Sequence, residues 1–231
     1  MQIHGLNKTT LLDYPEHVAA TIFTGGCNFC CPFCHNGELV LQPQAYPQIP
    51  EEEIMALLKK RKGILSGVCI TGGEPTLQKD LPAFIEKIKE LGYLVKLDTN
   101  GYRPEVLHRL LEQGLLDYVA MDIKNAKTHY PQTVGLKTMD LTRIEESVQI
   151  LIGGTIDYEF RTTVVRQLHT IDDFQDIAFW LDGARAYYLQ VYKDNENVIQ
   201  KGFSAYEKDE MESFLEVLAP HIEKVELRGI E

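Results

Sequence analysis

The sequence lacks the features that place a protein in a membrane, outside the cell or on nucleic acid. No stretch approaches the roughly 18 to 20 apolar residues of a membrane span. Residues 1–16 also lack the basic start and apolar run of a secretion signal. Lys and Arg total 23 against 34 Asp and Glu, and the formal charge of −11 argues against nucleic acid or an anionic membrane surface as the main partner. We therefore expect a cytoplasmic protein.

Cysteine is nearly absent outside one short segment. Four of the five cysteines lie in "GGCNFCCPFCHN", residues 25–36. A secreted disulfide framework spreads its cysteines along the chain, whereas tight clustering in a reducing compartment is typical of metal binding. The segment can be two CxxC pairs placed end to end. It can also be one CxxxCxxC motif that leaves Cys30 outside and consists of Cys27, Cys31 and Cys34.

The spacing favours the single motif. Cys30 and Cys31 are adjacent, so two CxxC pairs would have no intervening segment to turn them toward one tetrahedral zinc ion. A thiol–disulfide enzyme needs one CxxC and not two fused ones. Three cysteines at i, i+4 and i+7 can instead bind three irons of a 4Fe-4S cubane and leave the fourth iron open to a small molecule. Zinc bound by all four cysteines remains the alternative.

The rest of the chain has no repeat, low-complexity tract or linker, and we expect a single domain over residues 1–231 with its core at about 17–220. An apolar strand followed by an amphipathic helix recurs six times. The expected strands are 18–24, 67–71, 93–98, 117–124, 158–165 and 186–192. This alternation predicts an α/β fold with a parallel sheet covered by helices, either partly closed into a barrel or open and doubly wound. The tail "KVELRG" is expected to add an edge strand or to cap the end.

The unusual residues follow the strands in a regular way. After the cysteine segment come "TGGEP" (71–75), "DTNG" (98–101), "MDIK" (121–124), Arg161, and Gln190 to Lys193. Parallel strands end at one rim, where α/β barrels and open sheets build their sites, so these segments should converge. In isolation, "GGEP" and "DTNG" would each be read as ordinary tight turns.

At this point the sequence resembles a known family. The cysteine spacing resembles the CxxxCxxC signature of radical S-adenosylmethionine (SAM) enzymes, with Phe33 at the aromatic position before the last cysteine, and "GGEP" resembles their methionine-binding motif. "DYPEHVAATIFTGGCNFCCPFCHNGELV", "TGGEPTLQ", "DTNG" and "MDIK" resemble the glycyl-radical-enzyme activases. The match is best to the activating proteins of anaerobic ribonucleoside-triphosphate reductase, with pyruvate formate-lyase activase next. It covers residues 3 to about 192 and departs at Cys30, where those activases carry a basic residue.

The resemblance implies a partial (β/α)6 barrel and a set of cofactor-binding residues. Cys27, Cys31 and Cys34 would hold a 4Fe-4S cluster whose open iron binds SAM. The other implied contacts are Gly72, Gly73 and Glu74 to the SAM ammonium, Phe33 to the adenine, Asp98, Thr99 and Asp122 to a monovalent cation (Na⁺ or K⁺), Lys124 and Arg161 to the ribose or carboxylate, and Gln190 and Tyr192 near the adenine. Oxygen ligands suit a hard cation.

The resemblance also implies a function and partners. A flavodoxin or ferredoxin would reduce the cluster, SAM would be cleaved to methionine and a 5′-deoxyadenosyl radical, and this radical would generate a glycyl radical on a partner enzyme. Anaerobic ribonucleotide reductase is the first candidate partner, and pyruvate formate-lyase or another glycyl radical enzyme is the second. A radical SAM enzyme acting on a small molecule and a non-catalytic iron–sulfur electron carrier are the rival functions.

Overall fold

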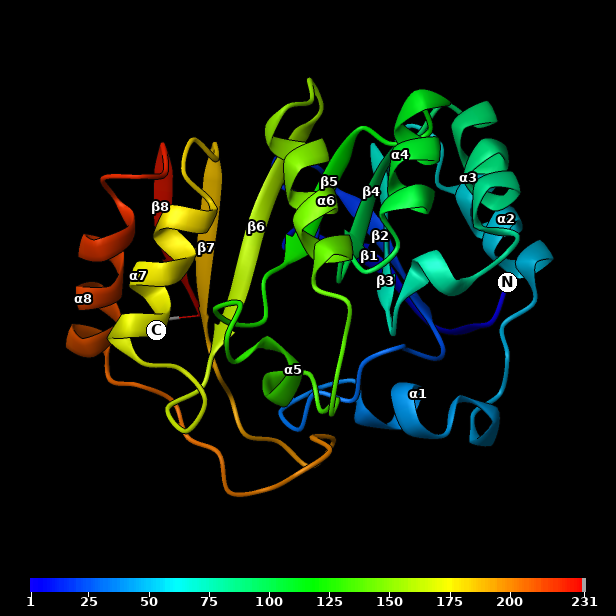
Figure 1. Cartoon of the computed structure of the whole chain (residues 1–231). Coiled ribbons are helices and arrows are strands. Elements are labelled where there is room, and N and C mark those ends of the chain that lie inside the picture. The colour runs from blue at the N-terminus through cyan, green and yellow to red at the C-terminus, as the bar shows by residue number, and fades with distance from the viewer. Residues whose placement is uncertain (230–231) are drawn as a thin grey trace.

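Eight β-strands form one sheet, in which each strand pairs with its neighbours in the sequence (Figure 1). The structure is a computed structural model that describes residues 1–229. The strands are β1 (Ile3–Thr10), β2 (Ala19–Thr24), β3 (Gly67–Gly72), β4 (Leu94–Thr99), β5 (Tyr118–Asp122), β6 (Asp157–Val164), β7 (Ala186–Val191) and β8 (Lys224–Arg228). Strands β2 to β8 run parallel and β1 is antiparallel to β2. Within residues 1–229, β1 and β8 do not pair, so the sheet is an open, partial barrel.

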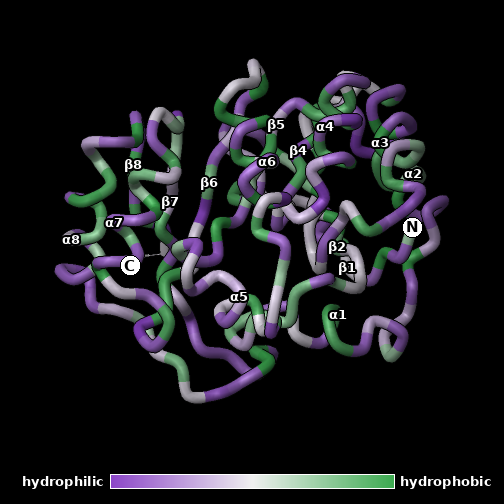
Figure 2. The backbone as a smooth tube through the Cα atoms, viewed as in Figure 1, coloured by the Kyte–Doolittle hydropathy of each residue, from purple (hydrophilic) through white to green (hydrophobic). Residues whose placement is uncertain are grey.

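The helices between the strands are α1 (Gly37–Leu41), α2 (Glu51–Lys60), α3 (Leu81–Glu90), α4 (Pro104–Glu112), α5 (Tyr130–Thr133), α6 (Thr142–Ile152), α7 (Ile171–Trp180) and α8 (Lys208–Leu218), with short 3-10 turns at Pro43–Ala45 and Pro75–Leu77. The longer helices cover the outer face of the sheet, and the short helices α1 and α5 lie among the loops at one end of the strands (Figure 1). The longer helices are amphipathic, and Figure 2 shows hydrophilic and hydrophobic residues alternating along α3 and α4. None of the helices in the described part of the chain is long and apolar enough to cross a membrane.

The local signals in the sequence explain where several helices begin and end. In α7, the Thr170 hydroxyl accepts from the backbone of Asp173 and the Asp173 carboxylate accepts from the backbone of Thr170, which is a complete capping box. In α2, three glutamates occupy the first turn and Lys59 and Lys60 the last, which complements the helix dipole. In α3, the apolar residues at helical spacing, Leu81, Phe84, Ile85 and Ile88, are all buried. The alternating α/β fold and its partial-barrel form are therefore confirmed.

The first and last strands of the sheet, β1 and β8, lie outside the expected core of residues 17–220. Strand β1 was not expected, because "IHGLNKTT" shows no alternation of apolar and polar residues; it exists because its backbone pairs with β2. The tail strand was expected, and β8 is indeed an edge strand parallel to β7. The short helices α1 and α5 were also missed, since four or five residues cannot display a helical period.

Candidate active site

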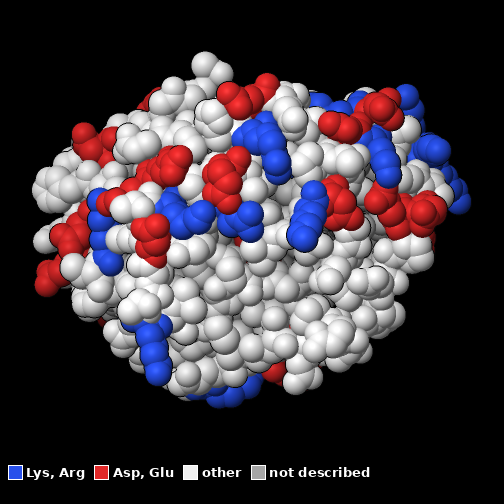
Figure 3. All heavy atoms as spheres, turned by 45° about the vertical axis from the view of Figure 1, so that its right-hand side comes forward, with Lys and Arg blue, Asp and Glu red and all other residues white. Residues whose placement is uncertain are grey.

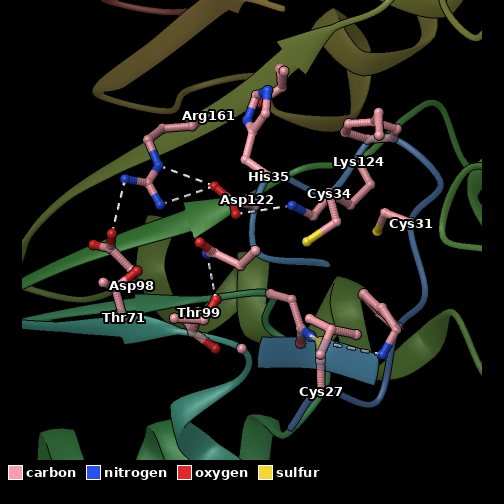
Figure 4. A pocket seen from close by; sticks show the side chains of 18 of the residues that line it. Cys27, Cys31, Cys34, His35, Thr71, Asp98, Thr99, Asp122, Lys124 and Arg161 are labelled. Atoms are coloured by element: carbon pink, nitrogen blue, oxygen red, sulfur yellow. Dashed lines mark hydrogen bonds and ion pairs between the residues drawn. The ribbon is translucent and has the colours of Figure 1, made fainter. Parts of the chain in front are cut away.

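The loops after the parallel strands enclose a cavity of about 230 Å³ at the rim of the sheet (Figure 4). Predicted site residues from six different strand–loop units meet there. Those lining it are Cys27, Cys31, Phe33, Cys34, Gly72, Gly73, Asp98, Thr99, Asp122, Lys124, Arg161 and Gln190. Two predicted residues, Glu74 and Tyr192, do not line it. The convergence expected from the parallel topology is therefore observed.

The cysteine loop is held in place by its own backbone and by the segment after α5. The Phe29 amide donates to the Cys27 sulfur at 3.3 Å, and the Cys30 amide donates to the Val134 carbonyl at 2.9 Å. A Cβ on Gly135 would lie 2.3 Å from the Cys30 carbonyl oxygen, so these two segments touch backbone to backbone. Cys30 is not among the residues that line the cavity, which distinguishes it from Cys27, Cys31 and Cys34.

The "GGE" segment clamps the start of the cysteine loop. The Gly73 amide donates to the Thr24 carbonyl and the Glu74 amide to the Gly26 carbonyl, both at 2.8 Å. A Cβ on Gly73 would lie 2.0 Å from the Gly26 oxygen, closer than any real Cβ contact. Glycine is needed here because the two loops approach each other closely. The motif fixes the cysteine loop as well as forming a wall of the cavity.

The Glu74 side chain is fully buried and joins two loops. Its carboxylate accepts from the Thr76 amide at 3.0 Å and hydroxyl at 2.6 Å, from the Thr99 hydroxyl at 2.8 Å and from the Asn100 amide at 2.7 Å. Burial raises the pKa of Glu74, and these donors act in the opposite direction. Both carboxylate oxygens are thus engaged within the protein. The predicted contact of Glu74 with the SAM ammonium stays a prediction, and the glycine backbone is the part of the motif that faces the cavity.

A row of alternating charges crosses the cavity floor from β4 to the end of β5 (Figure 4). Arg161 lies between two carboxylates, with its Nη1 3.2 Å from Asp98 Oδ2 and its Nε 3.0 Å from Asp122 Oδ1. Lys124 Nζ donates to the other Asp122 oxygen at 3.0 Å, and the buried Lys96 pairs with Asp98. The row presents both signs of charge to a ligand with an ammonium and a carboxylate.

The same row sets the protonation of its carboxylates. Burial alone would raise the pKa of Asp98, but Arg161 and Lys96 outweigh it and lower that pKa to about 2. The pKa of Asp122 is also lowered, because Arg161 and Lys124 outweigh its burial. Both groups are therefore anionic at neutral pH. The monovalent cation predicted beside them stays a prediction, and here the Arg161 guanidinium bridges the two carboxylates.

The thiols of Cys27, Cys31 and Cys34 must lose their protons before they can bind iron. Burial is the largest cause that raises the pKa of Cys27 and of Cys31 to about 12, and it also raises the pKa of Cys34. The positive charge of Lys124 favours the thiolates and so acts against burial on the pKa of all three cysteines. Iron binding would release these protons. Three soft sulfur donors beside a polar cavity fit a cubane that leaves one iron to a small ligand.

Sequence reasoning missed several residues of the cavity. Asn36 donates from its side chain to the Gly72 carbonyl at 2.8 Å, and Asn100 Nδ2 lies 3.7 Å from the Cys27 sulfur. His35, Thr71 and Thr163 also line the cavity. Their position next to a motif could have identified the two asparagines. Asn36 lies two residues after the last cysteine of the motif, and Asn100 belongs to "DTNG", which by itself resembles an ordinary turn.

Tyr192 lies behind His35 and outside the cavity. The two rings stack with centroids 5.5 Å apart and an interplanar angle of 15°, and Tyr192 is buried. His35 Nε2 donates to the Lys193 carbonyl at 2.7 Å. The predicted contact of Tyr192 with adenine stays a prediction, whereas its observed contact supports His35.

The surface around the cysteine loop carries little charge. Between His17 and Pro50, Glu38 is the sole Asp, Glu, Lys or Arg. Figure 3 shows charged side chains gathered on the upper part of the face and few on the lower part, over α1 and the neighbouring loops. The acidic excess of the chain therefore lies away from this part of the surface.

The fold and the cavity define the class of protein: an open parallel barrel with three cysteines and a row of charged side chains at its rim. The Radical SAM superfamily model matches residues 21–181, and the chain belongs to that superfamily. The predicted family is confirmed. Membership implies a 4Fe-4S cluster and SAM as cofactors, and the three cavity cysteines are the kind of sulfur donors that bind such a cluster.

The relatives that match this chain carry the names of different enzymes. The chain is 31% identical to a "Putative glycyl-radical enzyme activating enzyme" of Methanocaldococcus jannaschii, over 99% of this chain and 96% of that protein. It is 38% identical to a "Probable GTP 3′,8-cyclase" of Saccharolobus solfataricus, over 62% of this chain and 46% of that protein. Among solved structures, SuiB of Streptococcus suis bound to S-adenosylmethionine superimposes with a TM-score of 0.70 at 13% identity. That match covers 89% of this chain, which spans about half the length of SuiB. The likeness to SuiB concerns the fold.

Proposed function

We propose that this radical SAM enzyme is an activase that generates a glycyl radical on a partner protein. The observation that carries the proposal is the likeness to the M. jannaschii protein, which runs over nearly the whole length of both chains. Anaerobic ribonucleotide reductase is the first candidate partner, and pyruvate formate-lyase or another glycyl radical enzyme is the second. A cytoplasmic location stays a prediction from the sequence.

Each part of the cavity has a role in this proposal. Cys27, Cys31 and Cys34 would hold the cluster, and the Gly72–Gly73 backbone would border the methionine end of SAM. The row of charges would orient the SAM ammonium and carboxylate through Asp98, Asp122, Lys124 and Arg161, with Thr99 and a Na⁺ or K⁺ ion as further candidates. Phe33 and Gln190 would border the adenine. When bound and reduced by flavodoxin or ferredoxin, the cofactors supply a 5′-deoxyadenosyl radical.

The protein's own task is to position groups and to protect the reaction. The buried carboxylate of Glu74 joins the loops after β3 and β4, so two walls of the cavity are held to each other. In the proposed transfer, a Cα–H bond of the partner's glycine would break and the hydrogen atom would pass to the 5′-carbon, which would give 5′-deoxyadenosine and leave the unpaired electron on the glycine. Glycine suits this step because no side chain blocks the approach.

Anaerobic electron paramagnetic resonance tests the proposal directly. The reconstituted enzyme would be reduced with SAM and incubated in turn with purified anaerobic ribonucleotide reductase and pyruvate formate-lyase. A glycyl radical doublet on one of them, absent with Cys31→Ser and retained with Cys30→Ser, is the expected result. No doublet on either protein, together with 5′-deoxyadenosine release stimulated by a small molecule, contradicts the proposal.

The small-molecule alternative is favoured by local likenesses such as that to a GTP 3′,8-cyclase at 38% identity. That likeness covers under half of the cyclase, so a large part of that protein has no counterpart in the matched region. The same incubation with GTP in place of the partner protein separates the two functions.

A further inference from the structure

A second cavity opens beside the first, on the open side of the sheet. It has a volume of about 380 Å³ and shares His35, Thr163 and Gln190 with the cofactor cavity. Its other lining residues come from the end of β7, from residues 193–195 and from Arg228–Gly229 at the end of β8. The two cavities are therefore adjacent, with the three shared residues between them, and residues of β8 and of the segment after β7 line the second.

We propose that this second cavity is a peptide slot: the partner's glycine-bearing segment enters it in extended form, and its chemistry excludes nucleotides. This inference rests on the proposed function and adds to it the entry route and the selectivity. The slot is defined by Thr163, Gln190, Val191, Asn195, Arg228 and Gly229.

The positive charge of Arg228 is already neutralised. Its two Nη atoms donate to the two carboxylate oxygens of Glu159 at 2.8 and 2.7 Å, and Glu159 is buried. The guanidinium also lies 3.4 Å from the centroid of the Tyr188 ring. A bidentate, stacked arginine is rigid and has its charge matched. Among the described lining residues, Lys193 is then the one other lysine or arginine, whereas a triphosphate needs several cationic donors.

The remaining groups match a peptide backbone. Thr163 supplies a hydroxyl and Gln190 an amide with a donor and an acceptor. Asn195 Oδ1 accepts from the Asn197 amide at 2.9 Å, so the Asn195 side chain contributes its Nδ2 donor. Because His35 Nε2 donates to the Lys193 carbonyl, its hydrogen is already used. Within residues 1–229, β8 pairs with β7 alone, so its outer edge presents backbone N–H and C=O groups. An extended peptide can pair with such an edge while its side chains reach the neighbouring cavity.

The outer wall of the slot is fixed to the cysteine loop. The Gln200 amide donates to the Pro32 carbonyl at 2.8 Å, and a Cβ on Gly37 would lie 2.5 Å from the Asn197 carbonyl oxygen. With the His35–Lys193 hydrogen bond, these contacts hold residues 193–200 across the rim. A peptide in the slot would thus pass between this segment and β8, directly toward the cofactor cavity.

The test uses the full-length reconstituted enzyme and an uncharged probe peptide, acetyl-Ala-Ala-Gly-Ala-Ala-amide with a dideuterated glycine. Asn195→Trp and Val191→Phe would narrow the slot. Glu196→Trp is the matched control, because Glu196 is exposed and adjacent but does not line the slot. Mass spectrometry of 5′-deoxyadenosine measures deuterium transfer. A benzoylphenylalanine version of the peptide, irradiated with the enzyme, gives the binding position independently of turnover.

We expect deuterium transfer in the wild type and in Glu196→Trp, and a loss of about tenfold or more in both slot variants, corresponding to at least about 1.4 kcal/mol. Uncoupled 5′-deoxyadenosine formation should remain. Cross-links should map to residues 193–195 or 228–229. Three results would overturn the proposed slot: equal deuterium transfer in all variants, cross-links confined to residues outside 193–195 and 228–229, or cross-linking that GTP suppresses. If the proposed function fails instead, the wild type transfers no deuterium although the cross-links still map to the slot.

Discussion

The two sides of the rim are built differently. Around β2 to β4, backbone meets backbone: Gly73 lies against Gly26, and the Glu74 carboxylate is held by two loops. Around β6 to β8, side chains and one crossing segment surround a second cavity. Backbone contacts tolerate almost no substitution, whereas side chains at a cavity can change without moving the sheet. The first side, which holds the cysteines and is called the cofactor side, is therefore fixed by close backbone contacts. The second side is called the substrate side after the proposed slot, and side chains line it.

The largest expected effect is the loss of the cluster on the cofactor side when one of its cysteines is replaced. Cys31→Ser should abolish the visible absorbance of the reconstituted cluster, since a cavity-lining ligand is lost. Cys30→Ser is the matched control and should retain the absorbance, because Cys30 does not line the cavity. Iron analysis and absorbance spectra measure both. A colourless Cys30→Ser protein would support zinc or a four-cysteine site instead.

The ion pair between Asp98 and Arg161 joins the two sides, since it links β4 to β6. Asp98→Asn should lower the free energy of unfolding at pH 7 by about 3 kcal/mol, because it leaves buried cations without their partner. Glu51→Gln, in a pair with the exposed Lys87, is the control and should cost less than about 1 kcal/mol. Urea unfolding measures both. Equal effects would show that the buried row contributes no more than a surface pair.

The same residue gives a pH dependence with a definite sign. The pKa of Asp98 falls from 3.8 to about 2 on folding, so its carboxylate contributes stability above pH 3.8. As the pH falls from 3.8 toward 2, this contribution, about 2 kcal/mol, is lost. Asp98→Asn should therefore flatten the acid limb of stability against pH. Urea unfolding between pH 6 and the acid transition measures it, and an unchanged acid limb would contradict the assignment.

Gly73→Ala tests whether the clamp depends on close backbone contact. The new Cβ would lie 2.0 Å from the Gly26 oxygen, and we expect a loss of about 2 to 3 kcal/mol together with weaker cluster retention. At Gly92, with φ +87° and no atom within 4 Å of a built Cβ, alanine should cost about 1 kcal/mol from backbone strain and leave the cluster intact. Thermal unfolding and iron content distinguish the two. Similar iron content in both variants would argue against the clamp.

The smallest expected effect concerns the substrate side. His35→Phe keeps a ring to stack on Tyr192 but loses the hydrogen bond to the Lys193 carbonyl, so we expect about 1 kcal/mol of destabilisation. His35→Ala loses both contacts and should cost more. Hydrogen exchange should increase in residues 193–200 and remain unchanged in residues 72–76. Increased exchange in both segments would mean that the two sides are not independent.

The sequence by itself determined the family and most of the cofactor cavity. The spacing of Cys27, Cys31 and Cys34 favours these three as cluster ligands, because the adjacent Cys30 and Cys31 would chelate one tetrahedral ion poorly. Alternating strands and helices fix a parallel sheet, and its topology brings distant motifs such as "GGEP" and "MDIK" to one rim.

The tertiary structure decided what these side chains contact. Glu74 is inside the protein and not in the cavity, and Tyr192 supports His35, because burial and hydrogen-bond partners come from segments far apart in the chain. Strand β1 has no pattern of its own and exists by pairing with β2. The second cavity depends on β8 and residues 193–200 meeting the cysteine loop, and no local sequence signal encodes a contact between such distant segments.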